Sequence, residues 1–218
     1  MRLCAVIPVK SLAKGKSRLA GLLSIEERIS LSVAMLRDML ECLCSSPYIA
    51  STVIVSSDPL IKGIAREFNT ILVEDDVEHG VNTAVALADY IARGYDASVV
   101  LPHDLPLIDA IDLAMLYTST LHNARCVVIT PSSRLDGTNV LLRRPPDIIS
   151  THYDEDSYIL HVKEALASNA RVKILLSSRL MFDVDEPEDV RALLAKNHEC
   201  NARRYLLSIL DGAKKGSI

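Results

Sequence analysis

Short apolar segments alternate with amphipathic helical segments along most of this chain, and this alternation limits the possible folds more than any other feature. Apolar runs that are β-branched or bounded by proline predict strands at 3–8, 52–56, 70–73, 97–101, 126–130, 140–142, 172–175 and 180–185. Helical spacing, with a capping box at 24–27, predicts helices at 24–43, 60–68, 81–93, 109–122, 157–167 and from 187 onward. This order predicts a three-layer α/β fold, in which helices cover both faces of a mainly parallel sheet.

The composition excludes several classes of protein. With 218 residues, 49% of them hydrophobic, the chain is long enough for one substantial core. A net charge of -4 and an isoelectric point near 5.9 argue against a broad nucleic-acid-binding face. The apolar run at 3–9 is too short for a signal peptide or membrane span, so no membrane partner is expected. The five cysteines lack zinc-binding spacing and are expected to be reduced thiols in a cytoplasmic protein.

The segment 6–18 is the most basic part of the chain. It reads VIPVKSLAKGKSR and ends in Gly-Lys-Ser, as a phosphate-binding P-loop does. A P-loop needs another glycine five positions before Gly15, and Lys10 stands there instead. The segment is therefore either a solvated basic loop or a different kind of triphosphate site, with Lys10, Lys16 and Arg18 as its cations.

Polar residues follow the predicted strands, where ligands bind in open α/β sheets. Asp104 comes just after the strand at 97–101, and 136–139 follows the strand at 126–130. Asp183 and Asp185 are two apart in an extended segment, which predicts that they share one face. Each feature has a simpler alternative, namely a turn or, for Asp185, a helix cap. Together with the basic segment they predict a nucleoside-triphosphate site with a divalent metal.

Six segments carry a resemblance to a known family: IPVKSLAKGKSRL, SIEER, GVNTA, LPHDLPL, DGTNVLLRRPP and FDVDEPEDV. In this combination and order the chain resembles the 2-phospho-L-lactate guanylyltransferase (CofC) family of coenzyme F-420 biosynthesis. The resemblance implies a nucleotidyltransferase domain of the GT-A, Rossmann-like type over about 1–196. It implies transfer of GMP from GTP to the phosphate of 2-phospholactate or a relative such as phosphoenolpyruvate, with release of pyrophosphate. It also implies a homodimer.

The resemblance assigns roles to individual residues. Lys10, Lys16 and Arg18 would grip the triphosphate of GTP, and Lys16 and Arg18 with Asp104 are the expected catalytic residues. Asp104 would bind Mg²⁺, with Asp185 and, less closely matched, Asp183 completing the metal shell. The turn at Gly80, Asn82 and Thr83 would help hold the guanosine, although Asn82 could instead be an ordinary helix N-cap. Gly137, Thr138 and Asn139 would line the acceptor side.

One segment departs from the family pattern. Where the family has a glycine-rich stretch, this chain has Asp154, Glu155 and Asp156, followed by the matching Ser157 and His161 of the acceptor side. Carboxylates beside a phosphate repel it unless a metal intervenes. This loop therefore recruits a second Mg²⁺, or moves aside, or serves another acceptor. His161 could also be a structural histidine.

Two alternative functions remain open from the residues. One is another nucleotidyltransferase of the same fold, of the sugar-nucleotide or molybdenum-cofactor type, which the segment 136–146 disfavours. The other is a catalytically weak nucleotide-binding protein, suggested by the acidic loop. The tail at 197–218 has an apolar stripe that suits a helical extension, packed on its own chain or at a dimer contact.

Overall fold

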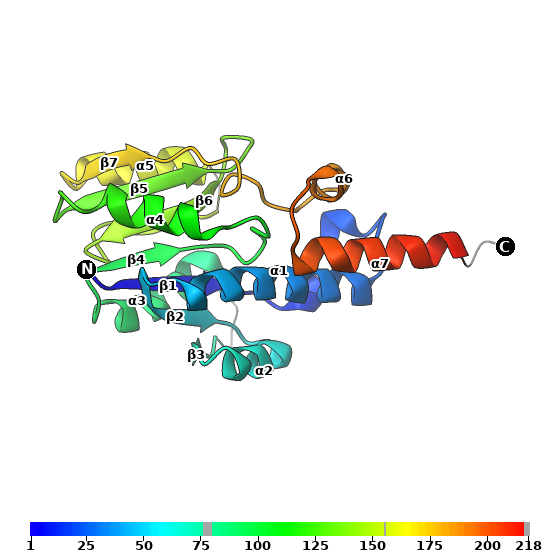
Figure 1. Cartoon of the computed structure of the whole chain (residues 1–218). Coiled ribbons are helices and arrows are strands. Elements are labelled where there is room, and N and C mark those ends of the chain that lie inside the picture. The colour runs from blue at the N-terminus through cyan, green and yellow to red at the C-terminus, as the bar shows by residue number, and fades with distance from the viewer. Residues whose placement is uncertain (76–79, 155, 216–218) are drawn as a thin grey trace.

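The computed structural model describes residues 1–75, 80–154 and 156–215, apart from the side chains of 211–215. Within these residues the strands form one sheet in the order β3-β2-β1-β4-β6-β5-β7 (Figure 1). β6 runs antiparallel to β4 and β5, and the other neighbours are parallel. The strands are β1 Leu3–Pro8, β2 Ile49–Val55, β3 Ile71–Val73, β4 Ala97–Val100, β5 Cys126–Pro131, β6 Thr138–Arg144 and β7 Arg171–Ile174.

Helices cover both faces of the sheet, which confirms the predicted three layers. The side chains of α1, α2 and α4 pack with the sheet in one buried cluster, and those of α3 and α5 in a second (Figure 1). Two 3-10 helices, η1 and η2, lie in the basic segment after β1. The helices are η1 Leu12–Lys14, η2 Ser17–Leu19, α1 Ile25–Ser45, α2 Pro59–Glu67, α3 Val81–Ala92, α4 Ala110–Ser119, α5 Ser157–Ala167, α6 Pro187–Ala195 and α7 Asn201–Lys215.

A third buried cluster joins the sequence-distant ends of the chain. Most of its members come from η2, the first half of α1, α6 and the start of α7, and Leu107 and Val184 join it from loops. Asp38 of α1 accepts hydrogen bonds from the backbone N–H groups of Asn201 and Ala202, at 2.6 and 2.9 Å. A carboxylate placed there satisfies N–H groups that have no partner within their own helix. The tail thus packs on its own chain, while the boundary at 196 stays a prediction, and residues 216–218 lie outside the described part.

The predicted elements are confirmed within a few residues at each end, with one exception. The predicted strand at 180–185 is wrong, because this segment is a turn followed by an irregular stretch. Hydrogen bonds to residues distant in the sequence hold its backbone in place. The Leu180 carbonyl accepts from Asn139 Nδ2 at 3.1 Å, and Val184 N donates to the Asp104 carbonyl at 3.2 Å. An apolar alternating pattern predicts extended backbone, but it does not supply a neighbouring strand to pair with.

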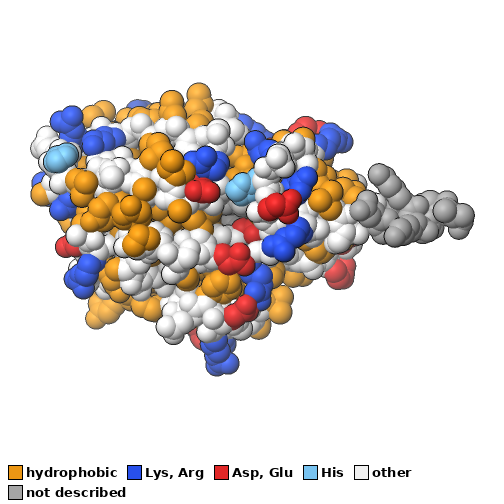
Figure 2. All heavy atoms as spheres, viewed as in Figure 1, with side chains coloured by type: hydrophobic (Ala, Val, Ile, Leu, Met, Phe, Trp, Pro, Cys, Tyr) orange, Lys and Arg blue, Asp and Glu red, His pale blue; other side chains and the backbone are white. Residues whose placement is uncertain are grey.

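The face of the molecule drawn in Figure 2 agrees with the charge balance of the sequence. Figure 2 shows acidic and basic side chains interspersed on this face, without a basic stripe. None of the helices described is both long and apolar enough to cross a membrane.

Candidate active site

A cleft of about 780 Å³ opens at the carboxyl ends of β1, β2 and β4. The antiparallel strand β6 begins at this same edge, so Thr138 and Asn139 face the ends of the parallel strands. The start of α3 and the start of α5 complete the walls, with Gly80 and Ser157 among the lining residues. Polar segments that are far apart in sequence therefore meet in one cavity, where open α/β sheets bind ligands.

Lys16 is buried and is not among the described lining residues, but it joins two predicted metal ligands, Asp104 and Asp185, that do line the cleft. Its side chain is 4% exposed, and its ammonium donates to Asp104 and to Asp185, the latter at 2.7 Å. Lys16 has a left-handed backbone, with φ of 51°. Arg28 of α1 donates to the preceding Gly15 carbonyl at 3.1 Å, which anchors the loop. Asp104 and Asp185 thus converge on one cation.

The charges of this group support each other. Burial alone lowers the pKa of Lys16, but the carboxylates of Asp104 and Asp185 raise it above its usual value. Burial favours a high pKa for Asp104, and the Lys16 ammonium holds that pKa below its usual range instead. Asp104 Oδ1 is buried and has no hydrogen-bond partner among the described residues. Lys16 and Asp104 are therefore both ionised, and one carboxylate oxygen still lacks a partner.

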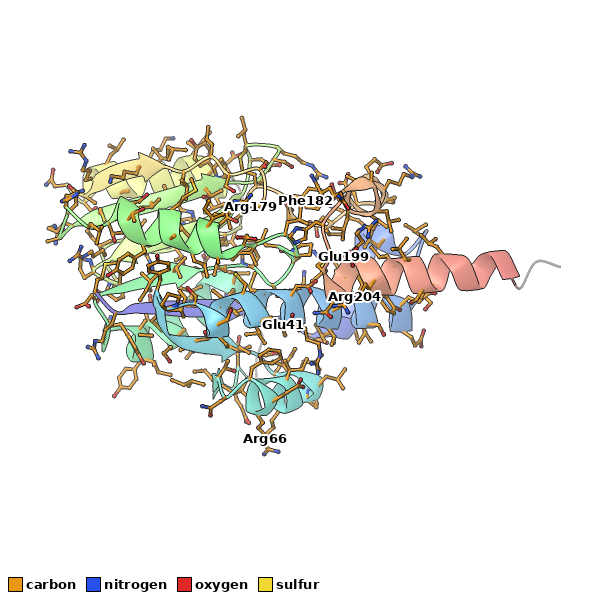
Figure 3. All side chains as sticks on the ribbon, viewed as in Figure 1. Glu41, Arg66, Arg179, Phe182, Glu199 and Arg204 are labelled. Atoms are coloured by element: carbon orange, nitrogen blue, oxygen red, sulfur yellow. The ribbon has the colours of Figure 1, made fainter. Side chains whose placement is uncertain are left out.

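Asp183 and Asp185 reach the cleft from the irregular segment before α6. Asn139 Nδ2 donates to Asp183 Oδ1 at 3.2 Å. Burial raises the pKa of Asp183, and the nearby charges of Asp104 and Asp185 raise it further. Phe182, which directly precedes Asp183 in the chain, is labelled in Figure 3.

Asp185 does not serve as the cap of α6. The N-cap is Glu186, and Asp189 accepts from the backbone N–H groups of Asp185 and Glu186 at 3.0 and 2.7 Å. The alternative that Asp185 is only a helix cap is therefore wrong. Its side chain is directed to Lys16 instead.

Two arginines flank the cleft and share one carboxylate. Arg18 Nη1 lies 3.3 Å from Glu186 Oε1, and Arg134 Nη2 lies 2.9 Å from Glu186 Oε2. Arg18, Lys10 and Arg134 all line the cleft. Arg134 was not predicted as a site residue, because one arginine in a serine-rich turn has no local signature in the sequence. The nearby DGTN motif was the only signal that could have drawn attention to it.

The predicted guanosine-binding turn is only partly at the cleft. Gly80 is the N-cap of α3, with φ of 98°, and lines the cleft. Asn82 is not the N-cap, so that alternative is wrong. Its Oδ1 accepts from Tyr153 N at 2.9 Å and its Nδ2 donates to Asp154 at 3.0 Å. Neither Asn82 nor Thr83 belongs to the cleft lining in the described parts of the chain.

The acceptor-side residues form one connected group. Gly137, Thr138, Asn139 and Ser157 line the cleft, and Ser157 Oγ accepts from Thr138 N at 2.8 Å. His161 is fully buried behind them and is not part of the described lining. Its Nε2 accepts from His152 N at 2.9 Å, so Nδ1 carries the proton and donates to Thr138 Oγ1 at 2.9 Å. His161 therefore occupies a structural position that supports Thr138.

The buried position of His161 predicts acid-sensitive stability. Burial lowers the pKa of His161 to about 3, so the unfolded chain binds a proton at His161 between about pH 6.5 and 3 while the folded chain does not. The stabilisation from neutral His161 is present above pH 6.5 and is lost as the pH falls. From pH 7 to 5 the unfolding free energy of the wild type should fall by about 2 kcal/mol more than that of His161→Gln. Urea titrations of both proteins at pH 7 and pH 5 measure these free energies. An equal fall in the wild type and in His161→Gln would contradict the prediction.

The cleft is rich in carboxylates. Of the residues described, eight aspartates line it: Asp75, Asp104, Asp136, Asp154, Asp156, Asp183, Asp185 and Asp189. Asp154 and Asp156 of the acidic loop thus face the cavity, whereas Glu155 lies outside the described residues. An anionic substrate would be repelled here unless cations accompany it.

A family model and two relatives of 30% identity or more point to the same family. The family model described as "Guanylyl transferase CofC like" matches residues 3–214. A phosphoenolpyruvate guanylyltransferase from Rubrobacter xylanophilus is 33% identical over 197 residues, which are 89% of this chain and 95% of that protein. A 2-phospho-L-lactate guanylyltransferase from Methanothermobacter thermautotrophicus is 30% identical over 207 residues, covering 94% and 90%.

Solved structures of lower identity share the fold. A protein from Desulfovibrio desulfuricans, described as a nucleotide-diphospho-sugar transferase, matches with a TM-score of 0.74 at 18% identity, over 98% of this chain and 97% of that one. CMP:2-keto-3-deoxy-manno-octonic acid synthetase, complexed with CTP, matches with a TM-score of 0.61 at 17% identity, over 89% and 99%. These likenesses establish a nucleotidyltransferase fold. Together with the family match, they show that this chain belongs to the CofC-like guanylyl transferases and is a nucleotidyltransferase.

Proposed function

We propose that this protein transfers GMP from GTP to the phosphate of a small phosphorylated carboxylic acid and releases pyrophosphate. The acceptor is 2-phospho-L-lactate or phosphoenolpyruvate, the acids named for its relatives, in coenzyme F-420 biosynthesis. The observation that carries the proposal is the convergence of Asp104 and Asp185 on the buried Lys16 ammonium, at a cleft that these two aspartates line together with basic side chains. Carboxylates and cations side by side are what transfer of a nucleotidyl group needs.

The donor triphosphate is assigned to the basic segment. Lys10 and Arg18 line the cleft from the segment after β1, and Lys16 of the same segment is buried against Asp104 and Asp185. The acceptor phosphate is itself a nucleophile, so no strong general base is required. Positioning of the two substrates and neutralisation of the pyrophosphate charge supply most of the rate.

The carboxylates at the base of the cleft suit Mg²⁺ in chemistry. Asp104 and Asp185 are hard oxygen donors that meet at one cation, Asp183 lies beside them, and Asp104 Oδ1 has no described hydrogen-bond partner. Within the described residues, no three acidic, histidine or cysteine side chains already form a metal cluster. The Lys16 ammonium and a divalent ion therefore compete for the charge of the same carboxylates. When bound, Mg²⁺ neutralises charge on the donor phosphates.

The acceptor is assigned to the wall formed by the start of β6 and the start of α5. Gly137, Thr138, Asn139 and Ser157 line this wall and provide small or polar groups. Asn139 also donates to Asp183, which connects this wall to the carboxylates. His161 supports it from behind through Thr138.

A substrate panel tests the proposal. Purified protein with Mg²⁺ is given GTP, ATP or CTP and either 2-phospho-L-lactate, phosphoenolpyruvate or a sugar phosphate, and pyrophosphate and nucleotide product are quantified. GTP with one phosphorylated acid should give the highest kcat/KM. The proposal would be rejected if turnover occurred only with a sugar phosphate, or if none of the acceptors supported turnover. Light scattering on the same preparation tests the predicted homodimer.

Arg18→Ala should weaken the use of GTP. Removing a charge-assisted contact to the triphosphate is expected to lower kcat/KM for GTP by about 1.5–3 kcal/mol, or roughly tenfold to a hundredfold. Arg191→Ala, which breaks an exposed pair with Glu188 on α6, is the control. Equal kcat/KM in both variants would mean that Arg18 is only a surface residue of the cleft rim.

The double variant Asp154→Gly, Asp156→Gly tests the acidic loop. If these carboxylates recruit a second Mg²⁺, the variant should need more Mg²⁺ for half-maximal activity while GTP binding stays nearly intact. Asp156 has φ of 47°, a conformation that glycine adopts readily, so the backbone should tolerate the change. An unchanged Mg²⁺ titration would leave displacement of the loop as the better account.

A further inference from the structure

Arg134 lies in a closed turn between β5 and β6. Ser132 N donates to the Gly137 carbonyl at 2.8 Å, and Leu135 N donates to the Ser132 carbonyl at 3.0 Å. Leu135 has φ of 63°, an unfavourable conformation for a leucine, and its side chain is exposed. Tight turns with an unfavourable residue are common at functional sites. This turn presents Arg134 at the cleft, directly before the residues that begin β6.

Glu186 balances only part of the positive charge at the rim of the cleft. Its two carboxylate oxygens are divided between Arg18 and Arg134, at 3.3 and 2.9 Å. Arg18 also lies 3.9 Å from Asp185 Oδ2, whereas Glu186 is the carboxylate paired with Arg134. The side chains of Arg134 and Glu186 are 44% and 35% exposed. An ion pair this exposed is weak, so an incoming anion can replace Glu186 at little cost.

The place of Arg134 in the chain connects it with the acceptor rather than the donor. Arg18 belongs to the loop after β1, with Lys10 and Lys16, whereas Arg134 belongs to the turn that leads to Gly137 and Thr138. A guanidinium offers paired N–H groups that match a carboxylate or a phosphate. Most charged groups around this cleft are aspartates, so an acceptor that carries both a phosphate and a carboxylate needs such a partner.

We propose that Arg134 binds the anionic acceptor, and that Glu186 is its resting counterion, released when the acceptor enters. This rests on the proposed function, since it takes the acceptor to be a phosphorylated carboxylic acid. Arg134 contributes little to the chemical step on this account, because its ion pair among the described residues is with Glu186 rather than with Asp104 or Asp185. The expected signature is a change in acceptor KM with kcat and GTP KM largely preserved.

Steady-state kinetics at saturating GTP, with phosphoenolpyruvate or 2-phospho-L-lactate varied, test this. Arg134→Gln should raise the acceptor KM by about tenfold to a hundredfold, and Arg134→Lys should recover part of it. Glu186→Gln should lower the acceptor KM by up to about fivefold, because it frees Arg134. Arg191→Gln, which breaks a more exposed pair with Glu188 on α6, should leave the acceptor KM unchanged.

Calorimetric binding of each acid, measured without turnover, separates this proposal from the proposed function. Loss of acid binding in Arg134→Gln, with unchanged thermal stability, supports Arg134 even if the acceptor panel shows no turnover. A wild-type acceptor KM and affinity in Arg134→Gln would overturn the proposal while leaving guanylyl transfer standing. A rise in GTP KM alone would overturn it too, because Arg134 would then belong to the donor site.

Discussion

Asp104→Asn should lower kcat by about 10²- to 10³-fold while leaving the fold intact, because it removes a charge at the centre of the site. Asn is nearly isosteric with Asp and still accepts a hydrogen bond from Lys16, so packing at the end of β4 is preserved. The lost charge weakens both the grip on the Lys16 ammonium and the proposed binding of Mg²⁺. Steady-state kcat and circular dichroism, measured on the same preparation, separate lost chemistry from lost structure.

Two further variants make the Asp104 test specific. Asp147→Asn removes an exposed carboxylate that pairs with Arg93, outside the cleft lining, and should leave kcat unchanged. Asp185→Asn should also lower kcat, since Asp185 bonds Lys16 and the α6 cap is provided by Glu186. Wild-type kcat in both Asp104→Asn and Asp185→Asn would remove these residues from the active site.

Lys16→Met should lower the unfolding free energy by roughly 3–5 kcal/mol, the usual cost of breaking a buried ion pair. The Lys16 side chain is 4% exposed and Asp104 15%, so the variant leaves a poorly solvated carboxylate without its cation. Methionine fills similar space, which limits the loss of packing. Added Mg²⁺ should raise the melting temperature of Lys16→Met more than that of the wild type, because the ammonium no longer competes for the carboxylates. Thermal unfolding with and without Mg²⁺ measures both effects.

The control for Lys16 is Lys62→Met, which breaks the exposed Lys62–Glu74 pair and should change stability by at most about 1 kcal/mol. Equal Mg²⁺ responses in the wild type and Lys16→Met would argue against a metal held by Asp104 and Asp185. Stability equal to the wild type would show that the buried pair contributes nothing to folding. Lys16→Ala should lower kcat/KM for GTP by about 1.5–3 kcal/mol. This measurement tests the contact with the triphosphate separately from the effect on stability.

Most of the fold could be predicted because its signals are local. The β-branched run that became β2 and the Ser24–Glu27 capping box that begins α1 each report on a few neighbouring residues. The irregular path of 180–185 could not be predicted in this way. It depends on Asn139 and Asp104, which approach from distant parts of the chain. The antiparallel direction of β6 likewise depends on pairing with β4 and β5 rather than on its own residues.

The sequence by itself determined that Asp104, the basic segment and the 136–139 motif would gather at the carboxyl edge of the sheet. Each of them follows a predicted strand in the chain, and the carboxyl ends of parallel strands lie at one edge. Only the tertiary structure decided how their charges are paired. It joined Lys16 to Asp104 and Asp185, directed Asn82 to the acidic loop, buried His161 behind Thr138, and brought Arg134 to the cleft opposite Glu186. The physical reason is range: propensity and spacing act over a few residues, whereas an ion pair depends on where the folded backbone brings distant side chains together.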